Sequence, residues 1–468
     1  MDQPEYNKVT TEFIDALKEV CGEENVLYDR EQLTAYGRDY TEDLSFPPEV
    51  VVKPGSTKEV SRIMRMAYDA MIPVTPIGAR TGLSGGCLSV YGGIGMSLER
   101  MNRILKIDED NLQVITEPGV ITQVLQEAVA EKGLYYAPDP ASRGSCFIGG
   151  NIAENSGGPR AVKYGVTKDF VLNLEVVLPD GAIIETGANT LKNSTGYNLT
   201  QLMVGSEGTL GIVTKATLKL VPKPSRELLM LVPFSSPEKA CKAVSAIFRA
   251  GITPSALEFM ERDAIEMAMR FTGDTRELSD NEQAHLLIEV DGNDEGALMS
   301  EMEAISGVLE RFDAGEMQLA QTAAEKDRLW NLRRKVGEAT HSHSVYKEED
   351  TVVPRYRLPE LLIAVKEIGN RYGFRSVCYG HAGDGNLHVN ILKEDMPDSQ
   401  WNEQVPKAIR ELFTKVVELE GTISGEHGIG LVQKEFMDVR FSKTELDLMR
   451  RIKQVFDPKQ LLNPGKIC

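Results

Sequence analysis

Residues 76–86 read Pro-Ile-Gly-Ala-Arg-Thr-Gly-Leu-Ser-Gly-Gly, and this glycine-rich stretch is central to the fold. Such a loop can turn several backbone N–H groups toward one point, and Thr81 and Ser84 add hydroxyl donors. Because glycine has no Cβ, the backbone can also come close to a bound pyrophosphate. Taken alone, the stretch fits either a phosphate-binding loop or an ordinary surface loop.

The region around this loop repeats the same composition. GGNIAENSGG follows at 149–158 and GSEGTLG at 205–211, with short β-rich runs such as 112–115 and 174–178 between the glycine clusters. Strands separated by glycine-rich turns predict an α+β domain whose loops bring a ligand close to the backbone. A G-x-G-x-x-G sequence between a strand and a helix is absent, and so is a Walker sequence, which argues against a Rossmann site or a P-loop.

The sequence changes character after Pro-Lys-Pro at 222–224, where we expect a domain boundary. Beyond it, helical stretches alternate with strand-like runs, which predicts a second domain built on a helix-covered sheet. The spacing of apolar residues predicts helices over 237–249, 295–312, 323–339, 358–372, 404–420 and 442–457, and strands over 228–232, 285–290, 375–380 and 387–392.

Composition limits the function classes. The 468 residues include 52 Lys and Arg and 70 Asp and Glu, a formal net charge of −18, so nucleic acid is not an expected partner. No run of 18 apolar residues predicts a membrane-spanning helix, and the polar start MDQPEYNKV lacks the apolar core of a signal peptide. Six scattered cysteines without a CxxC argue against an iron–sulfur cluster or a disulfide framework. We therefore expect a cytoplasmic protein.

Histidine placement indicates a candidate metal site. Asp384-Gly385 favours a two-residue hairpin turn, and a turn centred there pairs His381 with His388 directly across the two strands, with Cβ atoms about 5 Å apart. Two facing imidazoles can bind one metal ion. Asn390 lies on the same face, two residues further on.

A third ligand is expected from Ser-Gly-Glu-His-Gly at 424–428. Glu426 can complete a site of two histidines and one carboxylate, which leaves coordination positions open for a substrate. The adjacent His427 points the other way in an extended chain and stays unligated. A nearby cation lowers the pKa of an imidazole, so His427 is a candidate general base near neutral pH. His285, His341 and His343 lack this context and are expected to be structural or surface residues.

The ordered set of glycine-rich segments resembles the FAD-binding domain of the vanillyl-alcohol oxidase, or PCMH, superfamily over about residues 45–222. The resemblance implies that the loop at 77–86 binds the FAD pyrophosphate and that 138–158 and 205–213 line the flavin and adenine. No histidine precedes His285, so a histidyl–flavin link is excluded and FAD is expected to be held non-covalently. By resemblance, the cofactor-binding residues are Arg80, Thr81, Gly82, Ser84, Gly85, Pro138, Ser142, Gly149, Asn151, Ser156, Gly158, Glu207 and Ile212.

HAGDGNLH at 381–388 and GEHGIG at 425–430 resemble the C-terminal domain of the D-2-hydroxyacid dehydrogenase branch of that superfamily. This branch includes the glycolate oxidase flavoprotein subunit, FAD-linked D-lactate dehydrogenases and D-2-hydroxyglutarate dehydrogenase. The resemblance implies that His381, His388 and Glu426 hold a divalent zinc, iron or manganese ion and that His427 removes a proton. Arg333 matches the arginine that binds the substrate carboxylate, and Asn390 is assigned to the substrate as well.

The fold implied by the resemblance is α+β. It comprises a PCMH-type two-subdomain FAD-binding domain, an antiparallel-sheet, helix-covered substrate domain, and a C-terminal helical segment. We expect the FAD-binding domain over 1–222 with its core at about 45–222, and the substrate domain with the metal hairpin over 223–420. The segment 421–468 is expected to carry the catalytic histidine and return to the FAD-binding domain.

The expected function is FAD- and metal-dependent oxidation of a D-2-hydroxy acid, D-lactate or glycolate, to the 2-oxo acid, with hydride transfer to flavin N5. Glu348 stands where D-2-hydroxyglutarate enzymes have Lys, which favours a small monocarboxylate. D-2-hydroxyglutarate oxidation, a redox-neutral transferase of the same fold and a metal-dependent hydrolase remain open.

The expected electron acceptor is neither oxygen nor NAD. It is an electron-transferring flavoprotein, a quinone or an iron–sulfur subunit. Such a partner leaves peripheral association with the inner face of a membrane open, and a homodimer is open too.

Overall fold

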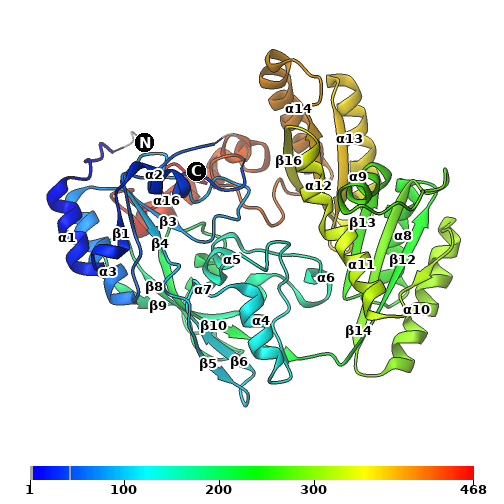
Figure 1. Cartoon of the computed structure of the whole chain (residues 1–468), viewed down its shortest axis with the longest axis horizontal. Helices are drawn as coiled ribbons and strands as arrows, with labels where there is room; N and C mark the ends of the chain where they lie inside the picture. The colour runs from blue at the N-terminus through cyan, green and yellow to red at the C-terminus, as the bar shows by residue number, and fades with distance from the viewer. Residues whose placement is uncertain (1–3, 42–43, 468) are drawn as a thin grey trace. The chain divides into compact units, whose positions relative to one another are not determined.

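A computed structural model of the chain describes residues 4–41 and 44–467 (Figure 1). The chain forms two compact units, which are described separately. The first unit comprises residues 1–157, 165–223 and 426–468, and the second comprises 158–164 and 224–425. The chain therefore passes from one unit to the other four times.

The first unit contains a four-stranded sheet with the order β1-β2-β4-β3, in which β2 and β3 run parallel to β4. Helix α3 (Thr57–Ala70) supplies the apolar residues Val60, Ile63, Met64 and Ala67 to the core of this sheet. The strands are β1 (Val26–Leu27), β2 (Val50–Val52), β3 (Val74–Ile77) and β4 (Ile94–Ser97).

This unit also contains a five-stranded antiparallel sheet with the order β5-β6-β10-β8-β9 and a two-stranded sheet of β11 and β7. The C-terminal residues return to the four-stranded sheet, because Leu462 pairs with Val74 and the Val74 N–H donates to Leu461 O at 2.8 Å. The remaining elements are α1 (Thr11–Cys21), α2 (Arg30–Tyr36), β5 (Ile104–Asp108), β6 (Gln113–Thr116), α4 (Thr122–Ala130), β7 (Leu134–Tyr135), α5 (Ile148–Glu154), β8 (Val171–Val177), β9 (Ile183–Glu185), α7 (Leu199–Met203), β10 (Ile212–Lys219), β11 (Val221–Pro222), α15 (Met437–Arg440) and α16 (Lys443–Phe456).

The second unit is built on a seven-stranded antiparallel sheet with the order β15-β12-β14-β13-β17-β18-β16. Strand β13 is buried at every position, so both faces of the sheet centre are covered. The strands are β12 (Arg226–Phe234), β13 (Ala256–Glu261), β14 (Ala284–Gly292), β15 (Gln318–Leu319), β16 (Tyr346–Val352), β17 (Arg375–Gly380) and β18 (Asn386–Leu392).

Helices cover this seven-stranded sheet. Residues of α9 and α11 form one hydrophobic core with Leu229, Leu231 and Met260 of the sheet, while α8 and α10 pack on β12 and β14. The helices of this unit are α6 (Ala161–Tyr164), α8 (Pro237–Arg249), α9 (Arg262–Thr272), α10 (Glu295–Leu309), α11 (Ala323–Arg334), α12 (Val336–His343), α13 (Leu358–Tyr372) and α14 (Asp398–Glu418).

A short arm from the glycine-rich region belongs to this second unit. Arg160 pairs with Glu289 of β14, and Lys163 and the Tyr164 hydroxyl bond Asp291 of the same strand at 2.5 and 2.7 Å. Residues 158–164 therefore contribute their side chains to the sheet of the second unit, although their sequence neighbours on both sides belong to the first.

In the part of the chain that the structure describes, no helix is both long enough and apolar enough to cross a bilayer. Cys21, Cys87, Cys146, Cys241 and Cys378 carry free thiols. Cys468 lies outside the described residues.

Candidate functional site

The second unit brings His381 and His388 together. Their ring centroids lie 5.4 Å apart with the ring planes nearly perpendicular, at 84°. Both side chains are buried, with 8% and 4% of their surface exposed. The two imidazoles therefore lie close together, as expected, but edge to face and not directly opposite one another across the two strands.

The predicted register of the hairpin is wrong. His388 pairs with Tyr379, and His381 lies beyond the end of β17 in a five-residue connection, 381–385. Two features replace the two-residue turn: the Gly383 N–H donates to Leu257 O of β13 at 3.0 Å, and of the two turn residues only Gly385 has a positive φ, +87°. A type I′ turn needs a positive φ at both central residues, so the longer loop forms instead.

A buried carboxylate that the sequence analysis missed joins His381 to Arg333. Glu258, in the middle of β13, is 0% exposed. Its two oxygens lie 2.9 and 2.8 Å from Nδ1 of His381, and one of them lies 2.7 Å from Nη2 of Arg333. Burial by itself raises the pKa of Glu258, but the contacts with His381 and Arg333 outweigh it and the pKa lies below its ordinary value.

Arg333 extends from α11 and is buried, with 7% of its surface exposed. Its guanidinium lies over the ring of Tyr379, 5.0 Å from the ring centroid. Its Nε is buried and has no hydrogen-bond partner among the described residues. A buried guanidinium with a donor to spare fits the binding of an anionic group.

A second carboxylate, Glu348 of β16, lies near His388, with 7% of its side-chain surface exposed. Its Oε1 is 3.6 Å from His388 Nδ1 and accepts a hydrogen bond from the Tyr379 hydroxyl at 3.2 Å. Glu348 pairs in register with Asn390, which is 0% exposed. Burial raises the pKa of Tyr379 well above its ordinary value, and the nearby Glu348 adds to the shift.

The other histidines differ in their surroundings. His285 is 1% exposed and bonds Glu282, and burial lowers its pKa, as expected for a structural residue. His343 is exposed and bonds Glu394. His341 stacks on Tyr346 and lies 3.3 Å from Glu348, so it borders the candidate site, which its sequence context did not indicate.

In the first unit, the stretch 77–86 begins at the last residue of β3 and forms the first part of the connection to β4. Added Cβ atoms at Gly82 and at Gly150 of α5 would meet no atom within 4 Å, so both backbones face open space. The Ser84 hydroxyl is buried and has no partner among the described residues. Open backbone beside an unpaired hydroxyl fits the binding of a pyrophosphate.

Several assigned cofactor residues have structural contacts of their own. Arg80 has a φ of +62°, and its guanidinium donates to Ala35 O and lies over Tyr36. Asn151 donates to the Thr122 hydroxyl at 2.6 Å. The others are placed as follows: Thr81 and Gly85 in the loop, Pro138 and Ser142 before α5, Gly149 at its start against Pro118, Ser156 after it, Ile212 in the hydrophobic core, and Gly158 in the second unit.

Glu207 has a contact that the sequence did not suggest. Its carboxylate accepts the N–H groups of Ile429 and Gly430 at 2.8 and 2.6 Å, and its own φ is +50°. Burial raises the pKa of Glu207 to about 7, although the two N–H donors oppose the shift. Burial and the nearby Glu207 raise the pKa of Glu154 well above its ordinary value. The two carboxyl groups border Gly428, whose added Cβ would lie 2.1 Å from Glu154 Oε2.

Glu426 and His427 belong to the first unit, together with most of the assigned cofactor residues. Within that unit, the Glu426 carboxylate packs against the Gly157 backbone, since a Cβ added at Gly157 would lie only 2.9 Å from Glu426 Oε2. The preceding Gly425 belongs to the second unit, where its N–H donates to Asp350 of β16. Glu426 and His427 are therefore the two residues that directly follow the one bonded to β16.

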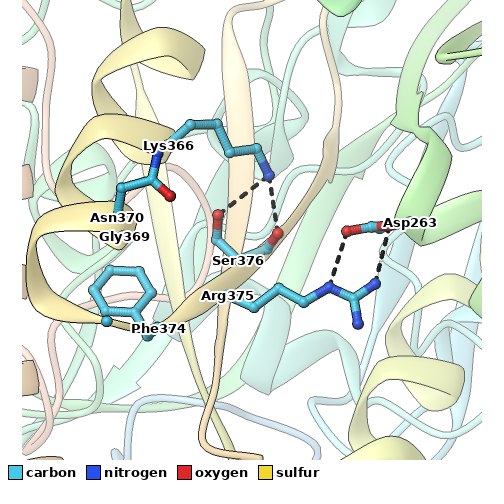
Figure 2. Close-up of a pocket in the computed structure, with 8 residues that line it drawn as sticks. Asp263, Lys366, Gly369, Asn370, Phe374, Arg375 and Ser376 are labelled. Atoms are coloured by element: carbon cyan, nitrogen blue, oxygen red, sulfur yellow. Dashed lines mark hydrogen bonds and ion pairs between the residues drawn. The ribbon is translucent and has the colours of Figure 1, made fainter.

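A hollow of about 440 Å³ on the second unit is a separate feature (Figure 2). Figure 2 shows Lys366 pointing to Ser376 and Arg375 pointing to Asp263. Lys366 also pairs with Glu261. Because protein groups already satisfy both cations, this hollow is not a strong candidate for an anion site.

Known proteins give an independent comparison. Residues 223–467 match the family model for the C-terminal domain of FAD linked oxidases, and residues 48–187 match the model for an FAD binding domain. The solved structure of 4-ethylphenol oxidase from Gulosibacter chungangensis aligns with a TM-score of 0.79 at 20% identity, over 99% of this chain and 98% of that one. The expected α+β fold with a PCMH-type FAD-binding domain is confirmed.

Full-length relatives are closer in sequence. A D-lactate dehydrogenase of Anaerostipes hadrus is 39% identical over 480 residues, covering 100% of this chain and 99% of that protein. The glycolate oxidase subunit GlcD of Bacillus subtilis (strain 168) is 40% identical over 460 residues, covering 98% and 97%. Further relatives are named D-2-hydroxyglutarate dehydrogenase. This chain therefore belongs to the FAD-linked oxidases and is a flavoprotein oxidoreductase, related over its full length to enzymes named for 2-hydroxy acids.

Proposed function

We propose that this protein oxidises a small D-2-hydroxy monocarboxylate, D-lactate or glycolate, to the 2-oxo acid. The observation that carries the proposal is the buried group Arg333, Glu258, His381 and His388, which sets an anion-binding guanidinium beside two facing imidazoles. Arg333 binds the substrate carboxylate through the donor atoms that Glu258 does not use, and Asn390 borders the same site.

FAD is held non-covalently by the loop at 77–86 together with 138–158 and 205–213, and when bound it accepts the C2 hydride at N5. The open backbone at Gly82 and Gly150 and the unpaired Ser84 hydroxyl support this assignment. Burial raises the pKa of the Cys87 thiol to about 12 and also raises that of Cys146, so neither sulfur is a good nucleophile for a flavin link.

His381, His388 and Glu426 would hold a divalent zinc, iron or manganese ion. When bound, the ion lowers the pKa of the substrate C2 hydroxyl. The perpendicular pair of imidazoles supports two of the ligands. The position of the preceding residue supports Glu426 as the third ligand. The Gly425 N–H donates to Asp350, which lies two positions along β16 from Glu348, and Glu426 is the next residue in the chain.

His427 takes the hydroxyl proton as the C2 hydride leaves, so the substrate loses two electrons and two hydrogens in all. The bonds from Ile429 and Gly430 to Glu207 fix the backbone directly after His427 and Gly428. A fixed backbone at this point limits the positions that the imidazole can take.

Glu348 supports a monocarboxylate substrate. A second carboxylate on the substrate would meet its negative charge beside His388, at a position that is largely buried and weakly screened. Oxidation of D-2-hydroxyglutarate is the alternative within the same chemistry. The electrons then pass to an electron-transferring flavoprotein, a quinone or an iron–sulfur subunit, since no nicotinamide-binding sequence is present.

The test is a screen of D- and L-2-hydroxy acids with an artificial electron acceptor, with and without a chelator. We expect D-lactate or glycolate to be turned over, the chelator to abolish turnover, and His381→Ala and His427→Ala to lower kcat at least about 100-fold. His343→Ala, which changes an exposed histidine outside the cluster, serves as the control and should keep full activity. Full activity in His427→Ala would refute its role as the base, and a lack of turnover with every hydroxy acid would refute the reaction.

A further inference from the structure

Glu258 is an unusual residue in its strand. It interrupts the apolar run of β13, between β14 and β17 at the centre of the seven-stranded sheet, and is 0% exposed. A buried carboxylate is costly unless charged and hydrogen-bonded partners surround it. Its two partners are His381 and Arg333, the residues proposed to bind the metal and the substrate.

The contact with His381 defines how that imidazole can be used. Both oxygens of Glu258 lie within 2.9 Å of Nδ1, so Nδ1 carries the proton and donates it. The lone pair is then on Nε2, the other ring nitrogen. Metal-binding histidines characteristically donate their second ring nitrogen to a carboxylate, which fixes the tautomer and the ring orientation.

Arg333 bonds Oε2 of Glu258, which is also one of the two oxygens next to His381 Nδ1. Nη2 of Arg333 donates to Oε2 of Glu258 at 2.7 Å, while the guanidinium lies over Tyr379. These two contacts fix the plane of the guanidinium, and Nε remains without a protein partner among the described residues. The orientation of the anion-binding group is therefore set before a substrate arrives.

We propose that Glu258 is a positioning residue for both functions: one carboxylate holds His381 with Nε2 ready to bind a metal ion and holds Arg333 ready to bind the substrate carboxylate. This inference rests on the proposed function and adds a residue to it. Its consequence is that a single substitution at Glu258 weakens metal binding and substrate binding together, although Glu258 touches neither ligand.

The experiment uses the flavin-loaded enzyme, stripped of divalent ions with EDTA and titrated calorimetrically with Mn²⁺ and Zn²⁺. Glu258→Gln keeps the size of the side chain but loses its charge, and should weaken metal affinity about 10- to 100-fold. The KM for the 2-hydroxy acid should rise at saturating metal. Glu258→Asp, which keeps the charge, should recover part of both losses.

Glu261→Gln is the matched control. Glu261 lies on the same strand, is buried and pairs with a cation, Lys366, but does not contact His381 or Arg333. The metal affinity of the Glu261→Gln variant should stay within twofold of the affinity of the unchanged enzyme. If the unchanged enzyme binds metal and Glu258→Gln binds it equally well, the role of Glu258 is refuted while the proposed function stands. If the unchanged enzyme binds neither ion, the proposed metal site itself fails.

A second measurement needs no variant of Glu258. Nitrogen-15 labelling of the six histidines, with the His381 signals identified by their loss in His381→Gln, reports the tautomer of His381 in the metal-free enzyme. We expect the proton on Nδ1. A proton on Nε2 alone would overturn the inference even if Glu258→Gln failed to fold.

Discussion

At the scale of single residues, buried carboxylates distinguish the sites of this protein. The side chains of Glu258, Glu348 and Glu207 are largely removed from solvent, and each is held by a different kind of partner. Glu258 accepts from the imidazole of His381 and the guanidinium of Arg333, Glu348 accepts from a phenol and lies near an imidazole, and Glu207 accepts from two backbone N–H groups. Their partners determine whether each one stays charged, and therefore what each does.

The charge of Glu348 leads to a prediction on substrate choice. Glu348→Gln removes the negative charge beside His388 while keeping the acceptor for the Tyr379 hydroxyl. The ratio of kcat/KM for D-2-hydroxyglutarate to that for D-lactate should rise about tenfold, equivalent to about 1.4 kcal/mol. Steady-state kinetics with both acids measures it. Glu394→Gln, an exposed carboxylate paired with His343, should leave the ratio unchanged.

Glu207 leads to a prediction on pH. Burial raises its pKa from 4.5 to about 7, so between these values the folded protein binds a proton that the unfolded chain has lost. The contribution of Glu207 to the free energy of unfolding is therefore complete below about pH 4.5 and falls by about 3 kcal/mol as the pH rises to 7. Urea unfolding of the unchanged protein and of Glu207→Gln at pH 5 and pH 7.5 measures the difference. An equal difference at both pH values would contradict the raised pKa.

At the scale of elements, the sequence predicted most of the second unit. Helices α8 and α13 begin and end at the predicted residues, and β17 does as well. Three helices differ by more than two residues. The predicted 323–339 breaks at Lys335 into α11 and α12, α14 begins six residues earlier than predicted, and α10 ends at Leu309 where the prediction ended at 312. Strand β13 and helix α9 were missed, because Glu258 interrupts the apolar pattern and Glu261 joins strand to helix without a turn residue.

The connection between β17 and β18 gives a prediction at this scale. Gly385 has a φ of +87°, and an added Cβ would lie 1.9 Å from Val353 O. Gly385→Ala should destabilise the protein by more than about 2 kcal/mol and move His381 away from His388, which weakens metal binding. Gly251→Ala is the control with the same conformation, at φ +86°, and open space around the Cβ. It should cost only about 1 kcal/mol in thermal or urea unfolding.

At the scale of the whole molecule, sequence order and compact units do not coincide. The arm 158–164 belongs to the second unit, while the C-terminal residues from 426 onward belong to the first. The guanidinium of Arg160 neutralises the buried charge of Glu289, whose carboxylate also accepts hydrogen bonds from the Ser255 hydroxyl and the indole N–H of Trp330. The folding of the second unit therefore depends on a segment that lies more than sixty residues before its first strand.

This dependence can be measured. Arg160→Ala leaves Glu289 buried with two neutral donors only, and should destabilise the protein by about 3 kcal/mol. Arg226→Ala removes an exposed arginine paired loosely with Glu295 and should cost less than about 1 kcal/mol. Equal unfolding midpoints for the two variants would show that the arm does not stabilise the second unit.

The sequence alone determined the elements and the chemistry of the motifs. The FAD-binding domain was predicted from the resemblance of the ordered glycine-rich segments to a known family. Local apolar spacing predicted most helices and strands, because such spacing depends on neighbouring residues in the chain. Tertiary structure alone decided the contacts between distant residues. Glu258 meets His381 across 123 positions, and the use of the Gly383 N–H by Leu257 set the hairpin register. Such pairings depend on how strands are ordered in the sheet, which local sequence does not encode.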